Sequence, residues 1–199
     1  MGKILILYYS RYGSVEKMAD FVARGVDQVE GMESIIRTVP PVSPVTKTAE
    51  PPVPPTGAPY VTLDDLKHCN GLVLGSPTRF GNMAAPMKYF WDTTSSLWLS
   101  GDLSNKPAGV FTSTSSLHGG QETTLVSMML PLIHQGMIIV GIPYTETELM
   151  TTTSGGTPYG ASHFAGFENQ HPLTDSEKMC CQTLGKRVAI IAQKIGGFI

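Results

Sequence analysis

Four short apolar tracts, separated by segments of helical period, dominate the pattern of hydrophobic and polar positions. The tracts cover residues 4–7, 72–74, 109–111 and 137–140. They are continuously apolar instead of alternating, which is typical of strands buried on both faces of a parallel sheet. A more polar segment, residues 34–39, is a candidate fifth strand at an edge of that sheet.

The intervals between the tracts predict helices. Apolar residues recur at helical spacing within residues 18–26, 87–97 and 125–133. Near the C-terminus, Thr174 and Glu177 form a capping box ahead of a further apolar face. Strands that alternate with helices predict an α/β fold with a doubly wound, five-stranded parallel sheet and helices on both faces.

Two segments fall outside this rhythm. Residues 40–59 contain many prolines, which lack the backbone donor that a sheet requires, so we expect a proline-rich surface insertion there. Residues 141–172 have no periodic pattern, and we expect a long loop that serves function or a contact. Residues 1–199 are predicted to form a single domain, because this length suits one compact core.

Composition and charge narrow the class of partner. Charged residues are 15% of the chain and the formal net charge is -2, so the chain lacks the basic field that attracts nucleic acids or anionic membranes. No apolar run reaches the ~18 residues of a membrane span, and the N-terminus does not resemble a signal peptide. We therefore expect no nucleic acid partner, no membrane span and a cytoplasmic location. The three cysteines lack metal-ligand spacing, so no metal site is predicted.

The stretch LYYSRYGSVEKMA predicts a phosphate site after the first strand. Ser10 and Ser14 offer hydroxyls, Gly13 permits close backbone approach, and a helix starting near Val15 presents unpaired N–H groups. The stretch lacks both the GxGxxG fingerprint and the P-loop lysine, which favours a non-reacting phosphate such as that of a bound mononucleotide. Serine and glycine also cap helices that bind nothing.

Polar, glycine-bearing loops also follow the next two core tracts. They read GSPTRFGNM and TSTSSLHGGQETT. Ligands in doubly wound sheets bind outside the carboxyl ends of the strands, so the three loops are expected to converge on one site. Arg79 and Phe80 are unusual in such a loop, although a solvated charge and a core aromatic would also account for them.

Together the motifs YYSRYGSVEKMA, GSPTRFGNM, SLHGGQETT and GGTPYGA resemble the WrbA family of NAD(P)H:quinone oxidoreductases, which are flavodoxin-like FMN proteins. The resemblance runs from residue 2 to about residue 195. It implies FMN as the cofactor, NADH or NADPH as the electron donor, a quinone as the substrate, and a homo-oligomer, either a tetramer or a dimer. The proline-rich stretch falls where that family carries its insertion relative to flavodoxin.

The resemblance also assigns individual residues. Tyr12 matches a position that meets the nicotinamide, and Trp98 matches one that meets the quinone; no residue is assigned a catalytic acid–base role. Trp98 also fits a packed aromatic, and His134 also fits a structural hydrogen-bonding group. The implied cofactor-binding residues are Ser10, Arg11, Tyr12, Gly13, Ser14, Val15, Pro77, Thr78, Arg79, Phe80, Gly81, Ser113, Thr114, Ser115, Ser116, Leu117, His118 and His134.

The implied reaction is a two-electron reduction of quinones to hydroquinones, with hydride passing through the flavin in a ping-pong sequence. The principal alternative is a flavodoxin-type carrier of single electrons. Such carriers are usually strongly acidic, and a net charge of -2 does not fit that description. A scaffold that uses the proline-rich stretch is a second alternative. Hydrolases are disfavoured, because the chain has neither a G-x-S-x-G elbow nor an HExxH pair.

Overall fold

A central sheet runs through the molecule, described here from a computed structural model over residues 1–42, 54 and 56–196. Its main strands lie in the order β2-β1-β3-β5-β6 and are parallel throughout. These strands are β1 (Gly2–Tyr8), β2 (Met32–Thr38), β3 (Gly71–Arg79), β5 (Pro107–Thr114) and β6 (Ile138–Ile139). This is one of the two common doubly wound orders, and it places β2 at an edge, as the sequence predicts.

The predicted number of five strands is too small, because two short strands join the sheet. β4 (Asn82–Met83) folds back antiparallel on the end of β3, and β7 (Ala161–Phe164) runs parallel to the second half of β5. β6 pairs only with the first residues of β5, so β6 and β7 share one neighbour. The prediction that residues 141–172 form one long loop is therefore wrong in part, since this segment contains β7 and the short helix α6 (Glu148–Thr151).

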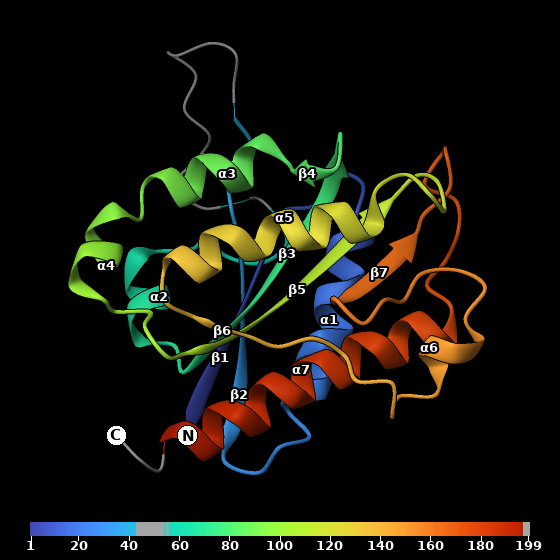
Figure 1. Cartoon of the computed structure of the whole chain (residues 1–199). Coiled ribbons are helices and arrows are strands. Elements are labelled where there is room, and N and C mark those ends of the chain that lie inside the picture. The colour runs from blue at the N-terminus through green and yellow to red at the C-terminus, as the bar shows by residue number, and fades with distance from the viewer. Residues whose placement is uncertain (43–53, 55, 197–199) are drawn as a thin grey trace.

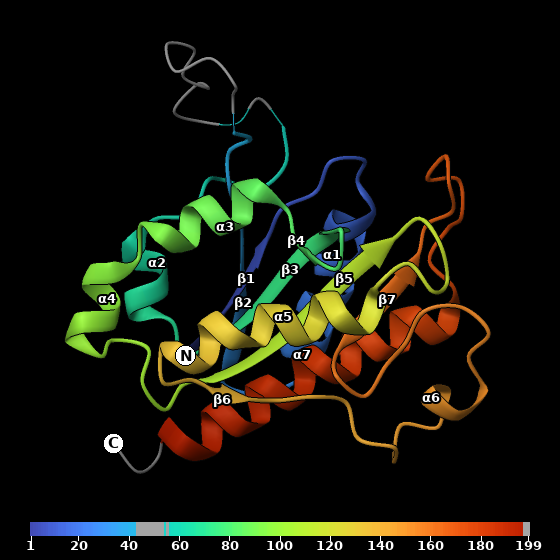
Figure 2. The ribbon, with the colours of Figure 1, turned by 45° about the horizontal axis from the view of Figure 1, so that its top comes forward.

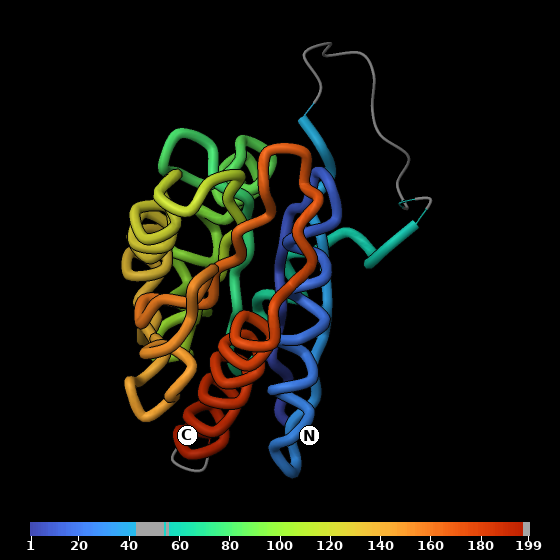
Figure 3. Tube along the Cα trace, turned by 90° about the vertical axis from the view of Figure 1, so that its right-hand side faces the viewer, coloured from blue at the N-terminus to red at the C-terminus, as the bar shows by residue number. Residues whose placement is uncertain are grey.

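Helices cover both faces of the sheet, so the predicted fold class is confirmed. One core contains side chains of α1 (Ser14–Val26) and α7 (Asp175–Gly196), and Figure 3 shows these two helices side by side, in blue and red. The other core lies under α2 (Leu63–His68), α3 (Ala85–Asp92), α4 (Ser95–Ser100) and α5 (Gln121–His134). Figure 1 shows the sheet between α5 and α7. The helix expected over 87–97 is divided into α3 and α4.

Most of the proline-rich insertion lies outside the described residues. Its described end returns to the sheet, where the Thr38 N–H donates to the Pro59 carbonyl at 3.1 Å and the Val61 N–H donates to the Thr38 carbonyl at 2.9 Å. Proline can take part here because it supplies only an acceptor. Within the described residues, no helix combines the length and the apolar character needed to cross a bilayer.

Candidate functional site

A cavity of about 330 Å³ opens at the carboxyl ends of the strands and is called the strand-end cavity below. Figure 2 shows the arrowheads of β5 and β7 at this same end of the sheet. The loop after β1, the last residues of β3 and the end of β5 with Ser115 all reach the cavity, as expected from the parallel topology. Its lining residues are Ser10, Arg11, Tyr12, Ser14, Val15, Pro77, Thr78, Arg79, Ser113, Thr114, Ser115, Ala165, Gly166, Phe167, Glu168 and Asn169.

The first loop presents the bare N-terminus of α1 to the cavity. The N-cap is Gly13, which has no side chain to satisfy the first N–H groups of the helix. Its φ of 85° lies in the left-handed region, where glycine is favoured. The Gly13 N–H donates to Ser10 Oγ at 3.1 Å, which fixes the loop in this shape. The positive end of the α1 dipole therefore faces the cavity, next to two serine hydroxyls.

The second loop is a tight hairpin between β3 and β4. Phe80 and Gly81 form the turn, both with positive φ (53° and 78°), which is the pattern of a type I′ turn. Phe80 is fully exposed, so the interpretation of this residue as part of the core is wrong. Phe80 and Gly81 lie outside the strand-end cavity, while Thr78 and Arg79 line it.

Two hydrogen bonds hold the end of β3 that lines the cavity. The Thr78 hydroxyl bonds the Thr124 hydroxyl of α5 at 2.7 Å. The Arg79 guanidinium donates to the Thr78 carbonyl at 2.7 Å. With Arg11 on the first loop, Arg79 gives the cavity two permanent positive charges.

The predicted segment 113–118 contributes only its first half to this cavity, namely the end of β5 and the first residue after it. Ser113, Thr114 and Ser115 line it, whereas Ser116 does not. Leu117 and His118 line a different cavity of about 540 Å³, between the start of α5 and residues 152–157. The structure thus separates the members of the predicted 113–118 set.

His134 and Trp98 also lie apart from the strand-end cavity. They share a third cavity of about 450 Å³ between α3, α4 and the C-terminal end of α5. Trp98 is about half exposed there. Two residues that line this cavity each carry a buried polar atom without a hydrogen-bond partner within the described part of the chain, namely Trp91 Nε1 and Gln135 Oε1.

A fourth loop completes the strand-end cavity, and it lies within the segment 141–172 for which the sequence predicts a role in function or a contact. It follows β7 and is called the β7–α7 loop below, residues 165–169. The sequence signal was weak because β7 has no apolar tract: its Ser162 and His163 are both buried polar residues. The length of the aperiodic segment 141–172 pointed to a functional loop, and the glycine-bearing turn FAGFEN ahead of the capping box is the signal that could have located the part that reaches the site.

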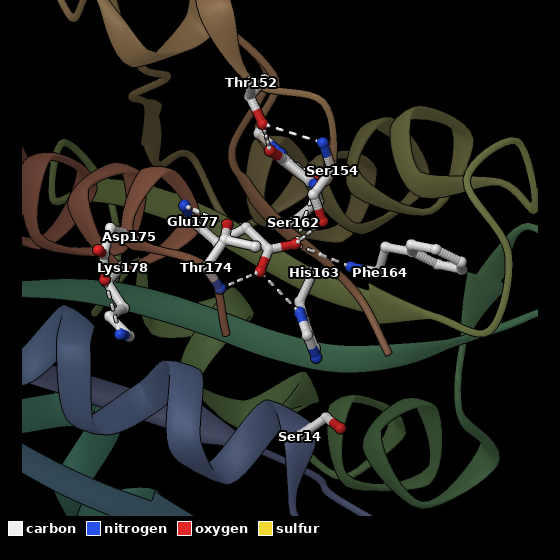
Figure 4. A network of polar contacts seen from close by, with 12 residues as sticks. Ser14, Thr152, Ser154, Ser162, His163, Phe164, Thr174, Asp175, Glu177 and Lys178 are labelled. Carbon is white, nitrogen blue, oxygen red and sulfur yellow. Dashed lines mark hydrogen bonds and ion pairs between the residues drawn. The ribbon is translucent and has the colours of Figure 1, made fainter. Parts of the chain in front are cut away.

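Glu177 fixes the base of this loop. The residue is fully buried, and its carboxylate accepts five hydrogen bonds (Figure 4). Oε1 accepts from Ser154 Oγ at 2.7 Å, from the Gly155 N–H at 2.9 Å and from the Phe164 N–H at 3.0 Å. Oε2 lies 2.8 Å from the Thr174 N–H and 2.9 Å from His163 Nδ1.

These contacts determine the charge state of Glu177. Burial by itself would raise the pKa of the carboxyl group, but hydrogen bonds from His163, Ser154 and the backbone of Thr174 and Phe164 lower the pKa to about 2. Glu177 is therefore ionised at neutral pH. The predicted capping box is confirmed, since the Glu177 N–H also donates to Thr174 Oγ1 at 3.3 Å, but it is only one part of this larger network.

Comparison with known proteins places the chain in a family. The model of the NADPH-dependent FMN reductase family matches residues 3–146. An NAD(P)H dehydrogenase (quinone) of Geobacter sulfurreducens is 42% identical over 202 residues, which cover 98% of this chain and 99% of that protein.

Solved structures agree on the fold. A flavodoxin, WrbA-like protein from Agrobacterium tumefaciens has a TM-score of 0.67 at 20% identity, over 98% of this chain and 99% of that chain. Oxidised flavodoxin 2 from Bacillus cereus has a TM-score of 0.60 at 17% identity, over 98% and 99% of the two chains. At these identities the likeness establishes the fold, which is flavodoxin-like, while the match to the family model decides the membership. The chain belongs to the NADPH-dependent FMN reductase family.

Proposed function

We propose that this chain is an FMN-dependent oxidoreductase that uses NADH or NADPH to reduce quinones to hydroquinones. The observation that carries the proposal is the strand-end cavity, in which three predicted loops meet beside the uncapped start of α1. Membership of the NADPH-dependent FMN reductase family supports the flavin. The 42% identity to an enzyme named NAD(P)H dehydrogenase (quinone) supports the donor and the acceptor.

The cavity suits FMN in size and in chemistry. Its volume of about 330 Å³ lies within the range of about 300–1,000 Å³ for small-molecule sites. We assign the phosphate to Ser10 through Val15, because helix N-termini and serine hydroxyls stabilise anions there. We assign the flavin ring to the edge formed by residues 77–79 and 113–115, which line the same cavity.

When bound, FMN supplies the chemistry: it accepts a hydride from the nicotinamide and passes two electrons to the quinone. The protein holds and orients the reactants. Arg79, held by its bond to the Thr78 carbonyl, places a positive charge at the cavity and stabilises negative charge on a reduced ring. Tyr12 lines the cavity and Phe80 follows the cavity-lining Arg79; both are exposed aromatics that offer flat surfaces to a nicotinamide or quinone.

Self-association of the chain would explain why Trp98 and His134, which the resemblance assigns to the site, lie outside the strand-end cavity. We propose a homo-oligomer in which Trp98 and His134 of one copy lie near the cavity of another copy. Large exposed apolar side chains on α4 and α5 support this proposal, namely Trp98, Leu99, Leu130 and Ile133. Sedimentation velocity should then give a dimer or tetramer; a monomer at micromolar concentration would contradict this part. We also propose that the chain works as one domain in the cytoplasm.

An anaerobic titration distinguishes the enzyme from a single-electron carrier. NADH, and then a benzoquinone, are added to the FMN-loaded protein while the visible spectrum is recorded. The proposed function predicts direct bleaching by NADH and rapid recovery of the oxidised spectrum with the quinone. An unchanged spectrum with NADH, together with a long-lived semiquinone after chemical reduction, would favour the carrier.

A further inference from the structure

The β7–α7 loop is fixed by contacts of its own. The His171 N–H donates to the Ala165 carbonyl at 3.0 Å, and the Asn169 N–H donates to the Gly166 carbonyl at 3.1 Å. The rings of Phe164 and His171 stack edge to face at 4.6 Å across its base. Together with the Glu177 network below it, these contacts hold the loop in one position at the cavity.

Asn169 joins this loop to the first loop, across 155 residues of sequence. Its Nδ2 donates to the Tyr12 carbonyl at 2.9 Å, and its Oδ1 accepts a hydrogen bond from Ser14 Oγ. The Tyr12 carbonyl can only accept, so the amide orientation is settled by this pair of contacts. Asn169 has a φ of 56°, in the left-handed region that asparagine tolerates better than most residues.

Both contacts act on the segment assigned to the phosphate. Tyr12 and Ser14 flank Gly13, the N-cap of α1. A carbonyl oxygen is partially negative and repels an anion, so an amide N–H that engages the Tyr12 carbonyl favours a phosphate nearby. The side chain of Asn169 is neutral, whereas its neighbour Glu168 and the two arginines, Arg11 and Arg79, already supply the charges of the cavity.

We infer that Asn169 is a positioning residue for the phosphate group of FMN, acting by clamping the Tyr12–Ser14 segment. The inference rests on the proposed function, since it requires FMN in the strand-end cavity. Through this clamp the chain distinguishes FMN from riboflavin, which has the same ring and no phosphate. When a phosphate binds, the Ser14 hydroxyl donates its hydrogen bond to the phosphate instead of to Asn169, because an ionised acceptor forms the stronger hydrogen bond. The hydrogen bond from Asn169 to the Tyr12 carbonyl remains.

Two substitutions separate the parts of this clamp. Asn169→Gly removes the amide and keeps the positive φ without backbone strain. Asn169→Asp keeps an acceptor for Ser14 but loses the donor to the Tyr12 carbonyl, and it adds a negative charge beside the phosphate. Asn105→Asp is the matched control: Asn105 also has a positive φ of 65°, is exposed and does not line the strand-end cavity.

The test measures FMN and riboflavin binding to the flavin-free full chain by fluorescence quenching. We expect FMN to bind about 3- to 10-fold more weakly to Asn169→Gly, the loss of one neutral hydrogen bond. For Asn169→Asp we expect a loss of at least about 30-fold that shrinks with added salt. Riboflavin affinity should change by less than about 2-fold in either variant, and Asn105→Asp should bind both flavins like the unaltered protein.

Two results would overturn the inference. Equal losses for FMN and riboflavin would make Asn169 a purely structural residue, and unchanged FMN affinity in both Asn169 variants would remove it from the site. If the unaltered chain bound no FMN, the proposed function itself would fail, and the inference with it. Melting temperatures of the flavin-free variants, recorded alongside, identify any loss that comes from unfolding.

Discussion

Glu177 offers the sharpest test of how the loops at this site are held. In Glu177→Gln, the amide oxygen can still accept from Ser154, Gly155 and Phe164. The amide nitrogen must then face the Thr174 N–H, which donates to Oε2 at 2.8 Å in the structure. Two donors would point at each other, so the Thr174 N–H loses its partner at a partly buried position.

The magnitude follows from the hydrogen bonds that Glu177 accepts. A buried donor left unpaired costs about 1–3 kcal/mol, and hydrogen bonds to a charged group contribute about 1.5–3 kcal/mol. The lowered pKa of Glu177 has the same cause, because these hydrogen bonds favour the ionised carboxylate over the neutral acid. We therefore expect Glu177→Gln to lower the free energy of unfolding by about 2–4 kcal/mol, or the melting temperature by about 5–15 °C.

The effect has a defined pH dependence. Because the folded-state pKa of Glu177 is depressed, its stabilisation is complete above the unfolded pKa of 4.5 and disappears as the pH falls toward about 2. Glutamine does not titrate. The difference in stability between the unaltered protein and Glu177→Gln should therefore be full at pH 6–7 and shrink steadily below about pH 5.

Urea unfolding of the flavin-free protein, followed by circular dichroism between pH 3 and pH 7, measures both quantities. Asp175→Asn is the control, because Asp175 lies in the same first turn of α7 with a fully exposed carboxylate paired to Lys178 at 2.8 Å. It should leave the stability nearly unchanged, because water and salt screen an exposed ion pair. A Glu177→Gln variant as stable as the unaltered protein, or one whose deficit does not vary with pH, would refute the account of the network.

Three further substitutions probe the site and its support. Gly13→Ala should weaken FMN binding about 10-fold, because a φ of 85° costs a non-glycine residue about 1–2 kcal/mol. Titration of the variant with FMN measures the affinity, and an unchanged affinity would contradict a loop held in this shape. Gly185→Ala should destabilise the fold by at least about 2 kcal/mol, because the Cβ of the new alanine would lie 2.1 Å from the Val22 carbonyl oxygen of α1. A melting temperature within a degree of that of the unaltered protein would count against this packing of α1 on α7. Trp98→Ala should impair quinone turnover more than FMN binding, as steady-state kinetics and flavin titration would show; equal losses would indicate a packing role instead.

The sequence by itself determined the layers of this fold. Uninterrupted apolar tracts mark β1, β3 and β5 because strands covered on both faces must be apolar throughout, and the strand order then brings their following loops together. The same reasoning found the first loop, half of the third and the capping box at α7. These are local features, since each depends on residues close together in the chain.

Only the tertiary structure decided what completes the site. The sequence did not predict β7, because this strand has buried polar residues in place of an apolar run. Their hydrogen-bond partners are distant in sequence: Ser162 bonds Gln121, and His163 bonds Glu177. For the same reason the sequence indicated a functional loop within 141–172 without showing that residues 165–169, with Asn169, are the part that reaches the site. His118 and Trp98 line cavities other than the one predicted for them, because strand register and helix packing determine where each segment lies. Such placements depend on contacts between residues distant in sequence, which no local pattern records.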